Sequence, residues 1–313
     1  MPRYQPMDAS VSPRFVGIRT FMRLPYVTDL EDVDVAIVGI PFDTGATYRV
    51  GARFGPAAVR EASALLRPYN PTQAVSIFDR LSVVDAGDIV VTPGFIDDSY
   101  ERITAHLEPM LRAGVTTLAI GGDHSITLAE LRAVSAVHGP VGLVQYDSHA
   151  DTWDQYWGHR YTHGTPIRRA VEEGLIAPER SIQVGLRGGL YAEGDYALST
   201  DLGIQIVPAL EVRERGLPAV AEMVKTRLGA GPSFVTFDID FLDPAYAPGT
   251  GTPEIGGFTT YEGQFFLRAL HGANVVAADV VEVLPSFDHG AITALAGAGM
   301  FYELLSQIAR RKG

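Results

Sequence analysis

Residues 141–151 read Val-Gly-Leu-Val-Gln-Tyr-Asp-Ser-His-Ala-Asp, a short apolar run that ends in three ionisable residues. The run from Val141 to Tyr146 predicts a strand buried on both faces, because its residues are mostly apolar and do not alternate with polar ones. Side chains at i, i+2 and i+4 share one face of an extended chain. Asp147, His149 and Asp151 are therefore expected to point the same way.

A second stretch of the same kind is Phe-Val-Thr-Phe-Asp-Ile-Asp at 234–240, which places Asp238 and Asp240 at the end of another buried strand. Together the two stretches bring four carboxylates and an imidazole to strand ends. So many carboxylates remain ionised in a low-dielectric interior only if cations or protons neutralise them. The pattern predicts a site for more than one metal ion; a hydrogen-bonded cluster at the strand ends and a single-metal site are the alternatives.

Strands and helices alternate along the rest of the chain. The predicted strands cover 33–40, 81–84, 115–120, 141–146, 181–184, 203–207, 233–237 and 275–283. One predicted helix begins at 55, and the others cover 97–113, 125–138, 166–174, 217–228, 260–270 and 291–310. Apolar strands separated by helices indicate an α/β fold with a parallel sheet covered on both faces. We expect one domain over 33–313, preceded by an arm at 1–32 that packs on the body or on a neighbouring subunit.

In parallel sheets the ligand site lies beyond the carboxyl ends of the strands. Every chemically reactive segment of this chain follows such an end, including His124 of Gly-Gly-Asp-His at 121–124 and Glu282. Four carboxylates match the charge of two divalent ions, and a pair of such ions can lower the pKa of a shared water. Oxygen-rich ligands without thiolate favour Mn²⁺ over Zn²⁺.

Composition narrows the class of protein. The chain has 313 residues and a net charge of −12, which argues against nucleic-acid and anionic-membrane surfaces and is compatible with small cationic substrates. It contains no cysteine, which excludes disulfides, thiolate zinc sites and a cysteine nucleophile. No apolar run approaches ~18 residues, so neither secretion nor membrane spanning is predicted and a cytoplasmic location is expected.

The chain resembles the ureohydrolases (arginase, agmatinase and related amidinohydrolases) over nearly its full length. The matching motifs are GGDHS at 121–125, DSHAD at 147–151, HGTP at 163–166, SFVTFDIDFLDPAYAPGTGTPE at 233–254 and DVVEV at 279–283. The resemblance implies a three-layer α/β/α fold with a mostly parallel sheet, assembled into homotrimers or hexamers.

It also implies two Mn²⁺ per subunit. One would be held by His124, Asp147, Asp151 and Asp238, and the other by Asp147, His149, Asp238 and Asp240. His163 would be the acid/base residue that shuttles protons, and Glu282 would anchor the guanidinium. The chemistry agrees, because a protonated guanidinium is a poor electrophile that needs a strong nucleophile, an orienting carboxylate and a proton donor. A buried salt bridge for Glu282 and a helix-start role for His163 remain alternatives.

Three other classes of protein are weighed against this one. Cysteine-based amidinotransferases and deiminases are excluded because the chain has no thiol. Single-zinc deacetylases share the fold type, but they need no second Asp-x-Asp and usually carry paired catalytic histidines. A catalytically inert paralogue in a hetero-oligomer is disfavoured because all six expected metal ligands are present.

The substrate pocket is expected between the metal motif and His163. An aromatic wall over a methylene chain or a cation is predicted from Trp153, Tyr156, Trp157 and Tyr161. Loop packing or a subunit contact is the alternative. Trp153 stands where arginases have an asparagine that reads the α-carboxylate, so arginine is not expected as substrate.

The stretches HGTPIRRA and PGTGTPEIGG resemble the agmatinase-like branch, which includes guanidinobutyrases and guanidinopropionases. Agmatine is the first expected substrate and 4-guanidinobutyrate the alternative. Asp154 is the candidate acid for an ammonium group; the candidate cations for a carboxylate are Arg160, Arg168 and Arg187. Ser148 and Ala150 replace the family's usual Ala and Thr, and both spacers are expected to point away from the metals.

Overall fold

The computed structural model describes residues 2–312, and its centre is an eight-stranded sheet in the order β4-β1-β5-β10-β9-β6-β7-β8. Each neighbouring pair in this sheet is parallel. The strands are β1 (Val35–Ile40), β4 (Val83–Asp88), β5 (Thr116–Gly121), β6 (Gly142–Tyr146), β7 (Ile182–Val184), β8 (Gln205–Val207), β9 (Pro232–Asp238) and β10 (Asn274–Val281). A separate antiparallel pair consists of β2 (Tyr69–Asn70) and β3 (Val75–Ser76).

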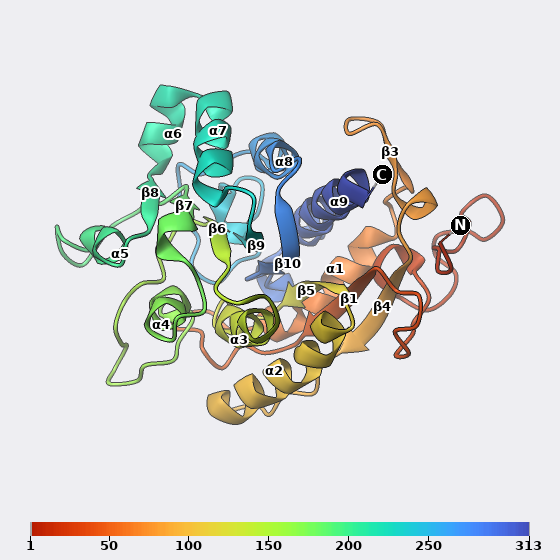
Figure 1. Cartoon of the computed structure of the whole chain (residues 1–313), viewed down its shortest axis with the longest axis horizontal. Coiled ribbons are helices and arrows are strands. Elements are labelled where there is room, and N and C mark those ends of the chain that lie inside the picture. The colour runs from red at the N-terminus through yellow and green to blue at the C-terminus, as the bar shows by residue number, and fades with distance from the viewer. Residues whose placement is uncertain (1, 313) are drawn as a thin grey trace.

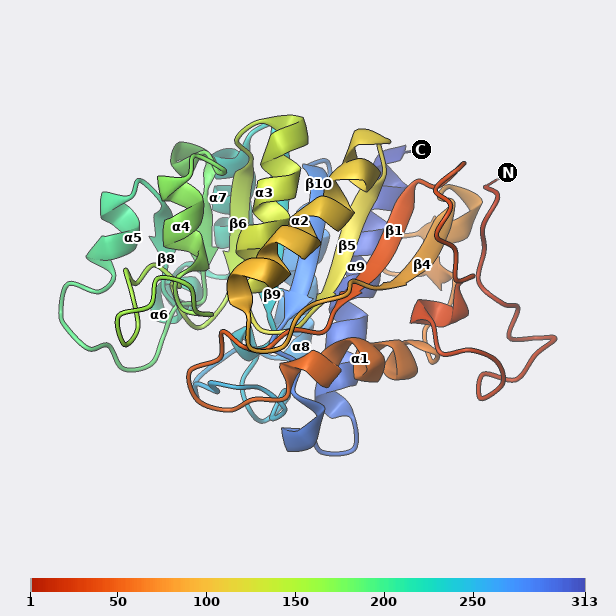
Figure 2. The ribbon, with the colours of Figure 1, turned by 90° about the horizontal axis from the view of Figure 1, so that it is seen from below.

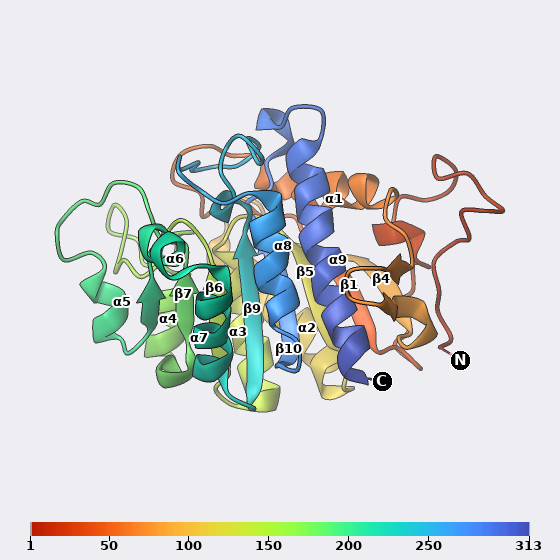
Figure 3. The same cartoon turned by 90° about the horizontal axis from the view of Figure 1, so that it is seen from above.

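Helices cover both faces of the sheet (Figure 1). Figure 2 shows α2, α3 and α4 over one face, and Figure 3 shows α7, α8 and α9 over the other. The α-helices are α1 (Gly55–Ser63), α2 (Ile96–Arg112), α3 (Ile126–His138), α4 (Pro166–Glu172), α5 (Ala197–Asp201), α6 (Ala209–Arg215), α7 (Leu217–Leu228), α8 (Thr260–Ala269) and α9 (Ile292–Lys312). The buried apolar residues form one cluster on each side of the sheet. The predicted three-layer α/β/α fold is confirmed.

Every predicted strand and helix has a counterpart, and the elements that the sequence did not predict are short. Helices α5 and α6 have five and seven residues, which is too short to display a helical period. The hairpin of β2 and β3 has two residues in each strand. Because these elements contribute few core residues, their omission left the predicted architecture correct.

Four adjacent strands place the functional motifs side by side. The order β5-β10-β9-β6 forms the middle of the sheet, although these strands are far apart in sequence. Since all four are parallel, the segments that follow them meet at the same edge of the sheet. His124 follows β5, Asp147 follows β6, Asp238 ends β9 and Glu282 follows β10.

Part of the N-terminal segment packs on this body. Residues 20–24 are buried, and the Phe21 N–H donates to Asp85 Oδ2 on β4 over 2.7 Å. The Phe21 ring lies 5.5 Å from that of Phe301 on α9. These contacts attach the segment to the end of the sheet opposite β8.

Among residues 2–312, α9 is the one helix long and apolar enough to span a membrane. However, 72% of its most apolar window is buried inside the fold. It packs against α1 and α8 and contributes Phe301, Leu304 and Leu305 to the core. Its apolar composition is that of a central core helix.

Candidate metal centre

The first motif turns instead of continuing as a strand. Strand β6 ends at Tyr146, the His149 N–H donates to Asp147 Oδ1 over 2.7 Å, and Asp151 adopts a positive φ of 53°. The prediction of an extended segment is therefore wrong. The three ionisable side chains nevertheless converge, because the turn and the left-handed residue redirect the backbone toward β5.

The second motif also turns. Strand β9 ends at Asp238, and a 3₁₀ helix covers Ile239–Phe241. The Asp240 N–H donates to Asp238 Oδ1 over 2.8 Å, which holds the two carboxylates close to each other. In both motifs the first aspartate uses one oxygen to bind the backbone two residues later, so the turn itself orients the carboxylate.

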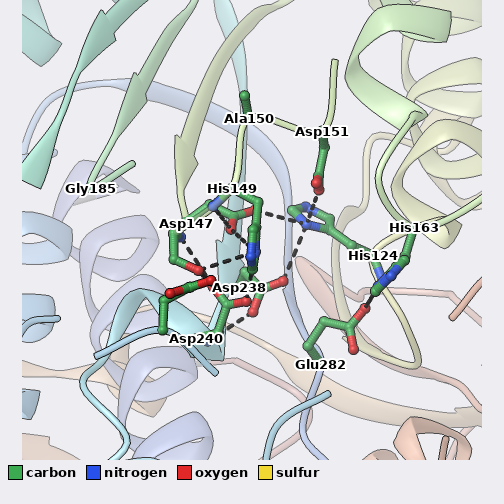
Figure 4. A network of polar contacts seen from close by, with 12 residues as sticks. His124, Asp147, His149, Ala150, Asp151, His163, Gly185, Asp238, Asp240 and Glu282 are labelled. Atoms are coloured by element: carbon green, nitrogen blue, oxygen red, sulfur yellow. Dashed lines mark hydrogen bonds and ion pairs between the residues drawn. The ribbon is translucent and has the colours of Figure 1, made fainter. Parts of the chain in front are cut away.

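The six predicted metal ligands meet in two adjoining clusters (Figure 4). In the first, His124 Nδ1 lies 2.8 Å from Asp151 Oδ2, 3.0 Å from Asp147 Oδ2 and 3.3 Å from Asp238 Oδ2. In the second, His149 Nδ1 lies 3.0 Å from Asp240 Oδ2 and 3.6 Å from Asp147 Oδ1. Asp147 thus presents one oxygen to each cluster.

The donor set fits divalent metal ions. Within residues 2–312, His124 Nδ1 and Asp240 Oδ2 are buried, and none of their short contacts has the angles of a hydrogen bond. Burial lowers the pKa of His124, yet Asp151, Asp147 and Asp238 outweigh that effect and raise this pKa well above its ordinary value. The cluster therefore requires positive charge, which cations supply when the imidazoles are neutral ligands.

A layer of polar side chains behind the ligands sets their orientation. His124 Nε2 lies 2.8 Å from Thr236 Oγ1, which directs the opposite nitrogen toward the carboxylates. Gln145 donates to Asp147 Oδ2 over 2.7 Å, and Gln183 donates to Gln145 Oε1 over 2.6 Å. Such contacts fix the tautomer and the rotamer of a ligand before a metal binds.

Beneath this layer lies a buried pair of acids, Glu130 on α3 and Asp279 on β10. Thr127 Oγ1 donates to Asp279 Oδ2 over 2.7 Å. Burial and the charge of Asp279 raise the pKa of Glu130 well above its ordinary value. Both influences favour the neutral form of Glu130 over its carboxylate.

The side chain of Ser148 contacts two of the candidate ligands. Its Oγ donates to Asp240 Oδ1 over 2.8 Å and lies 3.1 Å from His149 Nδ1. Ala150, the other spacer, lies in the same loop and accepts a hydrogen bond at its carbonyl from Gln183. The hydroxyl of Ser148 thus orients two ligands of the second cluster.

We expect Ser148→Ala to weaken binding at the second cluster about tenfold, because loss of a contact that orients a ligand typically costs 10–100-fold in affinity. A Mn²⁺ titration followed by electron paramagnetic resonance would measure both binding constants. The first cluster, which Ser148 does not contact, serves as the control within the same molecule. Equal affinities in the variant and the wild type would assign Ser148 to packing alone.

Glu282 and His163 lie together beside the first cluster (Figure 4). Glu282 has a positive φ of 62°, and its Oε1 accepts from the His124 N–H and lies 2.9 Å from His163 Nδ1. Its Oε2 is buried and lacks a hydrogen-bond partner in the described chain. A carboxylate held by one oxygen presents the other to a ligand.

The second nitrogen of His163 faces a loop that follows β1. Thr47 N–H donates to His163 Nε2 over 3.1 Å, and Thr47 Oγ1 lies 2.6 Å from the same atom. Burial lowers the pKa of His163, but Glu282, Asp123 and Asp151 raise it by more, so this pKa lies above its ordinary value. The imidazole is thus held at both ends: Nε2 accepts from the Thr47 N–H, which places the ring proton on Nδ1, facing Glu282 Oε1.

A cleft of about 550 Å³ opens above these residues. Trp153, Tyr156 and Trp157 line it. The Trp153 ring lies 5.3 Å from that of Tyr156 and 5.6 Å from that of Tyr191. Tyr191 lies beyond β7, thirty positions after Tyr161 at the end of the predicted aromatic segment, and no local pattern in the sequence indicates its place here.

Two further predicted pocket residues lie elsewhere. Tyr161 packs edge-to-face on Tyr100, with ring centroids 5.6 Å apart, and lies beside Arg132. Asp154 is exposed and forms an ion pair with Arg169 over 2.8 Å. Both predictions are wrong because the turn at 151–159 directs these side chains toward α2 and α4.

The predicted cations are also engaged away from the cleft. Arg160 and Arg168 form ion pairs with Glu172. Arg187 donates to the backbone carbonyls of Asp240 and Glu254 beneath the site. The charged residues that do line the cleft outside the metal centre are Arg49 and Glu254, which the sequence analysis did not single out.

Fold and site together define a three-layer α/β/α protein whose carboxylates and histidines suit a metal centre. The profile of the arginase family matches residues 33–306. The chain is 47% identical to guanidinopropionase of Pseudomonas aeruginosa, covering 97% of this chain and 96% of that protein. It is 44% identical to mitochondrial agmatinase of Gallus gallus, covering 96% and 88%.

A comparison with solved structures leads to the same family. Proclavaminate amidino hydrolase from Streptomyces clavuligerus superposes with a TM-score of 0.92 at 42% identity, covering 96% of this chain and 100% of that one. The chain belongs to the arginase family, and it is a hydrolase of linear amidines.

Proposed function

We propose that the protein is a binuclear manganese amidinohydrolase, which releases urea and an amine from a short linear guanidino compound. The observation that carries this proposal is the position of Asp147, whose two oxygens each face a separate His–Asp cluster. His124, Asp147, Asp151 and Asp238 would hold one ion, and Asp147, His149, Asp238 and Asp240 the other. A solved formiminoglutamase of Trypanosoma cruzi, 26% identical to this chain, contains manganese.

Bound metal ions supply a water molecule activated as a nucleophile near neutral pH. The chain supplies the rest. Glu282 Oε2 accepts N–H groups of the guanidinium and orients its plane. His163 keeps a proton available for the leaving amine, since the carboxylate of Glu282 stabilises its protonated form and Thr47 fixes its ring.

Two substrate types fit the cleft, agmatine and a guanidino acid such as 4-guanidinobutyrate. Both present a guanidinium joined by methylenes to a charged group, and the aromatic side chains of the cleft suit the methylenes. The carboxylate of Glu254 favours an ammonium end, whereas Arg49 favours a carboxylate end. We further propose a cytoplasmic homo-oligomer, a trimer or a hexamer, on the strength of the sequence resemblance.

A urea-release assay with added Mn²⁺ tests the reaction class. The compounds are agmatine, 4-guanidinobutyrate, 3-guanidinopropionate and arginine, and metal analysis of the same preparation should find about two Mn²⁺ per subunit. Urea from at least one of the first three is expected, with little from arginine. Urea from none would overturn the proposal, as would a protein that binds no metal.

A further inference from the structure

We propose that Arg49 binds the carboxylate of the substrate, so that guanidino acids are hydrolysed in preference to agmatine. This inference rests on the proposed amidinohydrolase function and deepens it. It starts from the two charged side chains that line the cleft outside the metal centre, Arg49 and Glu254.

Arg49 lies close to the catalytic groups. It follows two residues after Thr47, which contacts His163 Nε2. Its backbone carbonyl and the Oε2 of Glu282 both face Gly251, at 3.6 and 3.1 Å from the position that a Cβ would take there. A short substrate whose guanidinium meets Glu282 therefore has its other end within the reach of an arginine side chain on this loop.

The loop that carries Arg49 is held rigidly. Before it, the Gly45 N–H donates to Asp123 Oδ2 over 2.7 Å. After it, the Gly51 N–H donates to Asp43 Oδ2 over 2.8 Å, and Arg53 forms an ion pair with the same aspartate. Because the backbone is held on both sides, a ligand that binds Arg49 does not have to order this loop, and little binding free energy is lost to that step.

Most N–H donors of the Arg49 guanidinium have no hydrogen-bond acceptor in the described part of the chain. Nη1 makes one long hydrogen bond of 3.4 Å to the Thr250 carbonyl. The group also lies 4.7 Å from the ring centroid of Phe287 and 5.7 Å from that of Tyr48. In the described part of the chain it forms no ion pair, so most of its five N–H donors can meet a carboxylate in the bidentate manner.

Glu254, in contrast, already has a cation beneath it. Arg187, which is half-buried, donates through Nη2 to the Glu254 backbone carbonyl over 2.9 Å. The Glu254 side chain lies directly over Gly188, where an added Cβ would come within 2.4 Å of its carboxyl carbon. The Glu254 carboxylate thus has the charge of Arg187 in its surroundings, while in the described chain no carboxylate lies within ion-pair distance of Arg49. An anionic substrate end matches the unbalanced charge.

The test compares kcat/KM for 4-guanidinobutyrate and agmatine in the wild type, Arg49→Gln, Arg49→Lys and Glu254→Gln. In Arg49→Gln the value for 4-guanidinobutyrate should fall about 10–100-fold, the usual worth of a charge-assisted contact. The value for agmatine should rise, because a repelling cation is removed. Arg49→Lys should recover part of the acid activity, and Glu254→Gln should not lower it.

Three outcomes overturn the inference while leaving the reaction class intact. In the first, the wild type releases urea from agmatine alone. In the others, kcat/KM falls equally for both substrates in Arg49→Gln, or falls for agmatine only in Glu254→Gln. Inhibition by products gives a second measurement. We expect 4-aminobutyrate to inhibit the wild type more strongly than it inhibits Arg49→Gln. Putrescine should inhibit Arg49→Gln at least as strongly as it inhibits the wild type. Failure of the wild type on every guanidino compound is a different result, which contradicts the proposed function itself.

Discussion

Asp147→Asn is expected to abolish urea release and to lower the bound Mn²⁺ from about two per subunit to one or none. The reason is the dual position of this carboxylate, with Oδ2 3.0 Å from His124 Nδ1 and Oδ1 facing His149. An amide keeps the shape but loses the negative charge that both ions would share, and its nitrogen would not be a ligand. Turnover should drop by a factor of about 10⁴ or more, since activated water depends on both metals.

The measurement pairs a urea assay with metal analysis of the same sample. Asp97→Asn is the matched control, because Asp97 is exposed in the first turn of α2, far along the chain from the centre. Circular dichroism would show that both variants are folded. If Asp147→Asn kept both ions and near-normal turnover, the assignment of Asp147 as the bridging ligand would be wrong.

His163→Phe is expected to lower kcat by about 10²–10⁴-fold, the usual contribution of a positioned acid or base, with little change in metal content. The imidazole lies 2.9 Å from Glu282 Oε1 and 2.6 Å from Thr47 Oγ1 but contacts none of the six metal ligands through its ring. Phenylalanine fills the buried space without a proton to transfer. The loss of turnover should therefore occur without a loss of bound metal.

His159→Phe provides the control, because His159 lies on the same loop with its side chain exposed. It should retain nearly full turnover. A loss of Mn²⁺ in His163→Phe equal to its loss of activity would show that His163 acts through the metal centre, and an unchanged kcat would remove it from the mechanism.

The sequence was sufficient for the metal centre because each ligand follows a strand that its own residues define. Val141 to Tyr146 is apolar without alternation, so a buried strand before Asp147 could be inferred locally. Buried carboxylates need positive charge to neutralise them, so metal ions could be predicted without any knowledge of distances. Family resemblance added the roles of His163 and Glu282, and the structure brings these two side chains to 2.9 Å.

Local geometry and the cleft could not be inferred in the same way. Extended geometry through 147–151 was the natural expectation, but Asp147 binds the His149 N–H and Asp151 turns left-handed. Proximity in sequence also misplaced Asp154 and Tyr161, since a turn can direct neighbouring residues to opposite sides. Tyr191 and Arg49 enter the cleft from loops after β7 and β1, and only the folded chain brings them there.

What the sequence by itself determined is the fold class, and it also predicted the six candidate ligands and the chemistry they suit, because hydrophobic pattern and charge burial act over a few residues. What only the tertiary structure decided is the order β5-β10-β9-β6, which joins four distant strand ends at one edge. The same holds for the position of Arg49 at the cleft without an ion-pair partner in the described chain, and for the contact of Arg187 with the Glu254 backbone. Such juxtapositions arise from long-range packing, and no local pattern encodes them.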